Sequence, residues 1–178
     1  MRHSLPDAIL AEGRYLRFVR AKGWEYVDRS SPVEAAFIGA ITDDGKLLVT
    51  EEFRIPVNSK VIGCPAGLIG DLGDINESIE SGVERELEEE TGYTAKKITL
   101  LTRGPTSPGM STEVIHVVLA EGLTKVSRGG GVGDEDIQLH EVPLTKIDGW
   151  LEDRVREGKL IDPKVYTVLY FVGRRGSR

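Results

Sequence analysis

The sequence of 178 residues has little of what marks a secreted or membrane protein. It contains one cysteine, Cys64, so an intrachain disulfide is impossible and a reducing compartment suits the chain. The first 20 residues lack the continuous apolar core of a signal peptide, and no run approaches the roughly 20 apolar residues of a membrane span. We therefore expect a cytoplasmic protein with no membrane partner.

An excess of positive charge is also absent. The chain has 23 Lys and Arg against 29 Asp and Glu, a formal net charge of −6 at pH 7. It has no global attraction for polyanions, so we expect no nucleic-acid partner. A chain of this charge that binds a phosphate compound needs a local cation or a metal ion. Its length and its 39% of hydrophobic residues fit one globular domain.

The residue pattern predicts an α+β fold. Antiparallel strand pairs are expected at 14–20 with 24–29 and at 35–42 with 46–53. Polar and apolar residues alternate in the first pair, residues 35–42 are mostly small and apolar, and turn residues separate the two strands of each pair. Further strands are predicted at 97–102, 112–119 and 137–142, and helices at 78–91, 146–157 and 163–172. Helices packed on such strands give a layered domain. The glycine-rich segment 127–134 is predicted to be a flexible loop.

The most informative feature is the set of glutamates on the helix predicted at 78–91. Glu86, Glu89 and Glu90 are three and four residues apart, so they share one face beside an apolar row. Crowded carboxylates raise one another's pKa, and a hard divalent cation with oxygen ligands relieves that repulsion. The alternative is an ordinary solvated helix face, which is what most runs of like charge are.

The spacing around these glutamates resembles the Nudix box. Glu77 is followed after seven residues by Arg85-Glu86-Leu87-Glu88-Glu89-Glu90-Thr91-Gly92-Tyr93, and every specified position fits. The chance probability of that match is on the order of 10⁻⁸ at ordinary residue usage. The opening glycine of the box would stand at Asp71. Gly67 is its natural counterpart, so the loop 68–76 is about four residues longer than usual, a cheap change for a loop.

The resemblance implies a Nudix-type α/β/α sandwich with a mixed sheet and an N-terminal antiparallel hairpin. Residues 1–34 would be N-terminal strands that contribute to a dimer or to the substrate site, and residues 35–178 the catalytic domain. The implied activity is attack of a metal-activated water on a diphosphate bridge, with Mg²⁺, or alternatively Mn²⁺, as cofactor. The metal ligands would be Glu86, Glu90 and the Ala66 carbonyl, with Glu89 a ligand or proton acceptor. Glu77, Arg85 and Gly92 would be structural.

Segments outside the box resemble the ADP-ribose pyrophosphatases and related nucleoside-diphosphate-sugar hydrolases. Pro108 lies 16 residues after Gly92, the spacing that marks this subgroup, although the residues around it also read as a plain turn. The residues implied to contact substrate are Trp24, Arg29, Arg54, Gly67, Pro108 and Met110. Trp24 could equally serve core or dimer packing.

An acidic loop at 133–137 resembles a mobile loop of the same subgroup, in which Glu135 would complete the metal site. The general base stays open among Glu135, Glu113 and Glu89. The glycines at 129–131 fit a loop that closes over substrate, and they also fit a plain disordered bend. Gly63 stands where the subgroup usually has glutamate, which could change the accepted sugar or terminal group.

The sequence therefore predicts a homodimeric hydrolase of a nucleoside diphosphate linked to another group, with ADP-ribose cleaved to AMP and ribose 5-phosphate. Another nucleotide sugar, a dinucleoside polyphosphate or a modified nucleoside triphosphate are alternative substrates. A non-catalytic nucleotide-sensing Nudix module is the alternative of a different class, but such modules usually lose box glutamates that this chain keeps.

Overall fold

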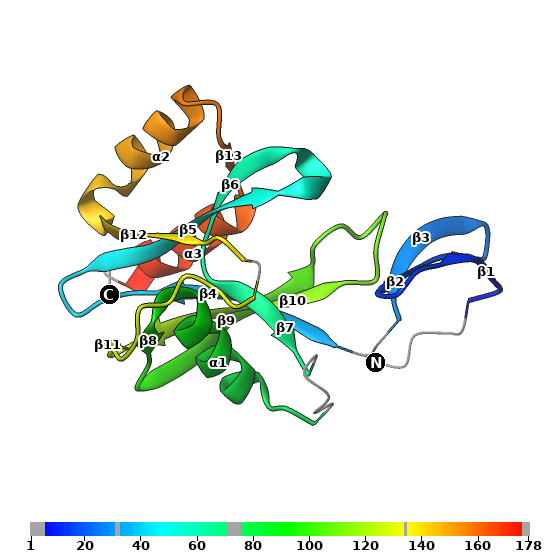
Figure 1. Ribbon diagram of the computed structural model, residues 1–178, viewed down its shortest axis with the longest axis horizontal. Coiled ribbons are helices and arrows are strands. Elements are labelled where there is room, and N and C mark those ends of the chain that lie inside the picture. The colour runs from blue at the N-terminus through cyan, green and yellow to red at the C-terminus, as the bar shows by residue number, and fades with distance from the viewer. Residues whose placement is uncertain (1–5, 31–32, 71–75, 134, 176–178) are drawn as a thin grey trace.

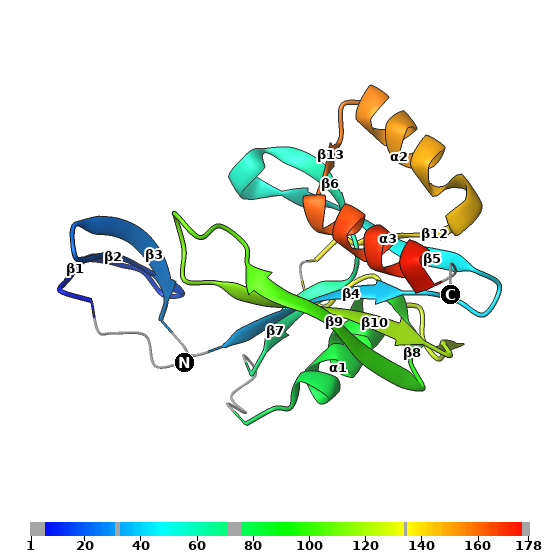
Figure 2. The ribbon, with the colours of Figure 1, turned by 180° about the vertical axis from the view of Figure 1, so that it is seen from behind.

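The protein forms two four-stranded sheets, a separate N-terminal sheet and three α-helices (Figures 1 and 2). The structure is a computed structural model, and it describes residues 6–30, 33–70, 76–133 and 135–175. Within these ranges, no helix combines the length and the hydrophobicity that a bilayer-spanning segment requires.

The central sheet lies between two helices. Its strands, in spatial order, are β7 (Ala66–Ile69), β4 (Glu34–Ala40), β10 (Val114–Glu121) and β9 (Lys97–Pro105). β4 and β10 run parallel and the other pairs antiparallel, so the sheet is mixed. α1 (Ile79–Thr91) packs on one face and α3 (Pro163–Arg175) on the other (Figure 2). These layers are the predicted α/β/α sandwich.

A second four-stranded sheet lies opposite α1. Its strands are β12 (Gln138–Pro143), β5 (Lys46–Arg54), β6 (Ser59–Gly63) and β13 (Leu160–Ile161), and α2 (Ile147–Arg156) lies beside β12 and β13. Short 3-10 helices, η1 (Ile55–Val57) and η2 (Leu144–Lys146), follow β5 and β12. β8 (Tyr93–Thr94) and β11 (Thr124–Lys125) pair beyond the end of α1.

Apolar residues on the two faces of the central sheet form two cores. Val83 and Leu87 of α1 pack with Ile38 on one face. On the other face, Phe37 of β4 packs with Val168 of α3. This division follows from the alternation of side chains along β4, which sends neighbouring residues to opposite faces. The central sheet thereby separates α1 from α3.

The N-terminal sheet projects to one side of the molecule (Figures 1 and 2). It contains β1 (Ala8–Glu12), β2 (Leu16–Ala21) and β3 (Trp24–Arg29), all antiparallel. The hairpin predicted from residues 14–29 is therefore part of a three-stranded sheet. β3 joins the rest of the chain through Val27, whose N–H donates to the Met110 carbonyl at 2.8 Å.

Most predicted elements are present, and the differences have local causes. β6 and β7 were not predicted, because Gly63, Pro65 and Gly67 interrupt the alternating pattern there. β1 was not predicted either. Asp71 and part of the loop 68–76 fall outside the described residues, as does position 134 of the glycine-rich segment.

Candidate active site

α1 forms where the box predicts it and presents two buried carboxylates. Ser78 caps its first turn, with the hydroxyl accepting the Ser81 N–H at 3.1 Å, and Gly92 ends it in the left-handed region at φ 75°. The side chains of Glu86 and Glu90 lie on the face that borders the apolar core and are 9% and 6% exposed. Ionised carboxylates are costly at such positions unless a partner compensates them.

Glu90 is the more strongly perturbed of the two. Burial, helped by the nearby carboxylates of Glu52, Glu86 and Glu135, raises the pKa of Glu90 to about 8, against the lowering effect of the Ala66 N–H. The Ala66 N–H donates to the Glu90 carboxylate at 3.1 Å. Among the residues that the structure describes, no cationic side chain therefore compensates the ionised form of Glu90.

Gly67 makes room for the other carboxylate. A Cβ at position 67 would lie 1.9 Å from Cδ of Glu86, closer than any real contact. Only glycine fits β7 at this point. The close approach supports Gly67 as the counterpart of the opening glycine of the box, as the sequence predicted.

Arg85 braces the segment before α1 against the helix. Its guanidinium donates to Glu77 at 3.1 Å, to Glu86 at 2.8 Å, to Glu89 at 3.3 Å and to the Leu68 carbonyl at 2.9 Å. Hydrogen bonds from Arg85 lower the pKa of Glu77, and the Gly70 N–H adds to the effect. These contacts fit the structural role expected for Glu77 and Arg85.

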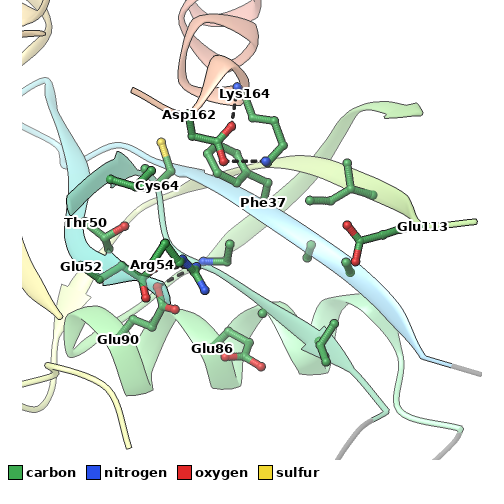
Figure 3. Close-up of a pocket in the computed structure, with 18 of the residues that line it drawn as sticks. Phe37, Thr50, Glu52, Arg54, Cys64, Glu86, Glu90, Glu113, Asp162 and Lys164 are labelled. Carbon is green, nitrogen blue, oxygen red and sulfur yellow. Dashed lines mark hydrogen bonds and ion pairs between the residues drawn. The ribbon is translucent and has the colours of Figure 1, made fainter. Parts of the chain in front are cut away.

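A cavity of about 440 Å³ opens above Glu86 and Glu90 (Figure 3). Six further residues that the sequence predicted for the site line it: Arg29, Arg54, Ala66, Gly67, Glu113 and Glu135. Arg29 and Glu113 form an ion pair of 2.5 Å that connects β3 to the segment before β10. The structure thus brings the box helix, the end of β5 and the acidic loop to one pocket.

Three charged residues that line the pocket were not predicted. Glu52 of β5 pairs with Arg54 at 2.5 Å, and its pKa is raised by burial, with Arg54 opposing and Glu135 adding to the rise. Asp162 and Lys164 form an ion pair of 2.6 Å at the start of α3, across the cavity from α1 (Figure 3). The doublet Glu51–Glu52 on a strand was a usable signal, since alternation sends one of the two to the pocket side. No motif marks Asp162 or Lys164.

Four predicted site residues do not line this cavity in a single chain. Trp24 and Met110 are 64% and 65% exposed, and Pro108 lies beside Met110 in the segment that contacts β3. Glu89 is bonded to Arg85 and likewise does not line the cavity. Their predicted roles stay predictions.

The donor atoms of the pocket fit a divalent cation. Among the described residues, no three Asp, Glu, His or Cys side chains already surround one point. The reason is visible in the contacts, because Arg85 holds Glu86 and Glu89, and the Val132 N–H holds the Glu135 carboxylate at 2.9 Å. Buried carboxylate oxygens without enough positive charge are nevertheless the ligands that hard cations such as Mg²⁺ prefer.

Comparison with known proteins agrees with this geometry. The family model of the NUDIX domain matches residues 32–163. An ADP-ribose pyrophosphatase from Bacillus subtilis is 40% identical over 121 residues, which cover 67% of this chain and 63% of that protein. A GDP-mannose pyrophosphatase from Yersinia enterocolitica is 37% identical over 125 residues, which cover 66% and 64%.

A solved structure extends the likeness to nearly the whole fold. A crystal structure of an ADP compounds hydrolase aligns with a TM-score of 0.73 and 25% identity, covering 94% of this chain and 89% of that one. The alignments with the two sequence relatives span less than two thirds of those proteins. Because the family model matches most of the 178 residues and α1 carries the complete glutamate pattern of the box, the chain belongs to the NUDIX family.

Proposed function

We propose that this protein hydrolyses the diphosphate bridge of a nucleoside diphosphate linked to a sugar, with ADP-ribose as the favoured substrate and AMP and ribose 5-phosphate as products. One observation carries the proposal. The buried carboxylates of Glu86 and Glu90 face the same cavity as the guanidinium of Arg54. The Asp162–Lys164 ion pair lines the other side of this cavity. The names of the two relatives, which act on ADP-ribose and GDP-mannose, agree with this substrate class.

Each part of the pocket has a task in this proposal. Glu86, Glu90 and the Ala66 carbonyl hold a divalent cation, Mg²⁺ or alternatively Mn²⁺. A cation bound there supplies charge stabilisation for the phosphates and a more acidic water. The Arg54 guanidinium, placed at the end of β5, binds a phosphate of the bridge by two parallel hydrogen bonds. Arg54 is free to exchange its contact with Glu52 for substrate, because its side chain is half-exposed.

Glu135 is the favoured proton acceptor for the attacking water. It lines the cavity and lies near Glu90 and Glu52, whose pKa values it helps to raise. Glu113 is instead engaged by Arg29, and Glu89 by Arg85. Glu113 and Glu89 therefore remain alternatives that would have to leave these partners first.

The far side of the cavity suits a sugar as the terminal group. Asp162 and Lys164 place an acceptor and a donor side by side, and adjacent sugar hydroxyls need both. Because Asp162 and Lys164 form an ion pair, this side of the cavity carries no net positive charge that would attract a terminal phosphate. Gly63 leaves space beside this pair, since a Cβ there would meet Thr50 Oγ1 only at 3.5 Å. Nucleotide sugars are therefore favoured over nucleoside triphosphates.

We also propose a homodimer built on the N-terminal strands of residues 1–34. Leu16, Phe18 and Trp24 leave 40% or more of their surface exposed on a small projecting sheet, which a second copy would cover. In such a dimer Trp24, Pro108 and Met110 could contribute to the partner's cavity. A cytoplasmic location remains a prediction from the single cysteine.

A product assay tests the proposed function. The protein is incubated with Mg²⁺ and ADP-ribose, ADP-glucose, GDP-mannose, a diadenosine polyphosphate or 8-oxo-dGTP, and the products are separated by ion-exchange chromatography. We expect AMP and ribose 5-phosphate from ADP-ribose, formed faster than products from the others. Preferred cleavage of GDP-mannose would keep the site and change the base and sugar. Nucleotide binding with no cleavage of any compound would contradict the proposal and favour the sensing module.

A further inference from the structure

The C-terminal end of α1 is held by the glycine-rich loop that leads to Glu135. A helix end leaves its last four carbonyls without partners inside the helix. Here the Glu89 carbonyl accepts the Gly131 N–H and the Glu90 carbonyl accepts the Gly130 N–H, both at 2.9 Å. The Thr91 carbonyl accepts Lys125 Nζ at 2.7 Å. The peptide groups that carry Glu89 and Glu90 are thus bonded directly to the loop.

The approach of the loop to the helix requires glycine on both sides. A Cβ at Gly129 would lie 2.4 Å from the Thr91 carbonyl carbon, and a Cβ at Gly92 would lie 2.2 Å from the Ser127 oxygen. Both glycines also have positive φ, 67° and 75°. The flexible loop expected over residues 127–134 stays a prediction, but at Gly129 the absence of a side chain permits close backbone contact with the end of α1. We call residues 129–131 the glycine clamp.

The clamp also fixes the start of the acidic loop. A Cβ at Gly131 would lie 2.6 Å from Cβ and 2.8 Å from Oε2 of Glu135. The Ile137 N–H returns to the Gly130 carbonyl at 3.2 Å, which closes the loop on itself. The glycine clamp therefore bonds to α1 carbonyls through its N–H groups, and the α-carbon of Gly131 lies against the Glu135 side chain.

We propose that the glycine clamp is a positioning device that sets the Glu135 carboxylate relative to Glu86 and Glu90 through backbone bonds to the end of α1. This inference rests on the proposed function, in which Glu135 is the proton acceptor, and on the sequence-based expectation that Glu135 completes the metal site. Glu135 is among the residues that line the cavity, and the clamp residues are not. The clamp residues act through Glu135. Because their bonds to α1 join backbone groups, the distance between α1 and the loop does not depend on side-chain motion.

A matched pair of substitutions tests the clamp. Gly131 and Gly133 both have positive φ, 89° and 63°, so alanine strains the backbone in either place. The methyl of Gly131→Ala would meet Glu135 and, at 3.2 Å, Cδ1 of Ile137, whereas around the methyl of Gly133→Ala no described atom lies within 4 Å. The two variants share the strain and differ in the contact with Glu135.

The readouts are the Mn²⁺ dissociation constant, measured by electron paramagnetic resonance, and kcat and KM for the best substrate. We expect Gly131→Ala to weaken Mn²⁺ binding and to lower kcat, each roughly 10-fold or more, as for loss of a group that orients a ligand. KM should change little, and Gly133→Ala should stay near the wild type. Equal values for the two variants would overturn the proposal.

A double-mutant cycle asks whether Gly131 acts through Glu135. In a Glu135→Gln background, Gly131→Ala should add little further loss. Independent losses that multiply would overturn the proposal, and so would a Glu135→Gln variant with unchanged Mn²⁺ affinity and kcat. Absence of hydrolysis with normal Mn²⁺ binding by the wild type would overturn the proposed function alone, since the metal-binding comparison still reports on the clamp.

A stability control covers poor folding of Gly131→Ala. Its melting temperature is compared with that of Gly131→Ala/Glu135→Gly, which lacks the two nearest atoms that the new methyl would meet and keeps only the longer contact with Cδ1 of Ile137 at 3.2 Å. We expect the double variant to melt at a higher temperature. A double variant that melts no higher would show that the methyl disturbs something other than Glu135, and it would overturn the proposal.

Discussion

A buried acid behind the pocket wall gives a quantitative prediction of stability. Glu51 of β5 is 2% exposed and accepts hydrogen bonds from Lys159 at 2.8 Å, Lys60 at 2.9 Å and His140 at 3.1 Å. Burial by itself would raise the pKa of Glu51, but the hydrogen bonds and charges of the two lysines outweigh it and lower the pKa to about 2. Glu51 is therefore ionised in the folded protein down to strongly acidic pH.

The lowered pKa converts into a free energy that depends on pH. An unfolded glutamate has a pKa of about 4.3, and a difference of roughly 2 units corresponds to about 3 kcal/mol. Because the folded pKa is the lower one, this contribution is complete above the unfolded pKa. It is lost as the pH falls from about 5 toward 2, and at pH 3 about half of it remains.

Urea denaturation of the wild type and Glu51→Gln at several pH values tests this prediction. The free energy of unfolding should be about 3 kcal/mol lower for the variant at pH 7, and the difference should shrink to about half of that value at pH 3. Glu25→Gln is the control, because Glu25 pairs with Arg20 on the exposed N-terminal sheet and such pairs contribute less than about 1 kcal/mol. A difference for Glu51→Gln that is constant across this pH range would refute the reasoning.

Two further predictions concern the pocket. Gly67→Ala should weaken Mn²⁺ binding roughly 10-fold or more, because the methyl displaces the Glu86 carboxylate, whereas Gly104→Ala in β9, with open space around it, should bind Mn²⁺ normally in the same titration. Lys164→Gln should lower kcat/KM for a nucleotide sugar about 10-fold, the loss of a hydrogen bond from a charged donor, and should leave kcat/KM for a dinucleoside polyphosphate nearly unchanged. Equal losses for both substrates would contradict a role of Lys164 toward the sugar.

The sequence predicts the metal-binding helix well because its determinants are local. Ser78 and Gly92 mark the two ends, and three-and-four spacing fixes which glutamates share a face. The order of layers also follows, since short strands with helices between and after them have few ways to bury their apolar faces. The bounds of α1 and β3 accordingly agree with the prediction to within one residue.

The rest of the site depends on contacts between distant segments. Asp162 and Lys164 reach the cavity only because β13 pairs with β6. The sequence does not predict β6, because nearby glycine and proline residues interrupt the alternating pattern. The glycine clamp illustrates a different limit. Glycines signal conformational freedom, but whether that freedom is used for motion or for close packing depends on what lies opposite, which for Gly129 is the end of α1.

The measurement that tests the central claim most directly compares Mg²⁺-dependent turnover of ADP-ribose by the wild type and by Glu90→Gln. Glu90→Gln keeps the size of the buried side chain, so circular dichroism should show an unchanged fold. We predict that turnover falls by at least about 10²-fold, as when a group that stabilises transition-state charge is removed. Near-native turnover in a folded Glu90→Gln variant would contradict the assignment of the α1 carboxylates as the centre of the reaction.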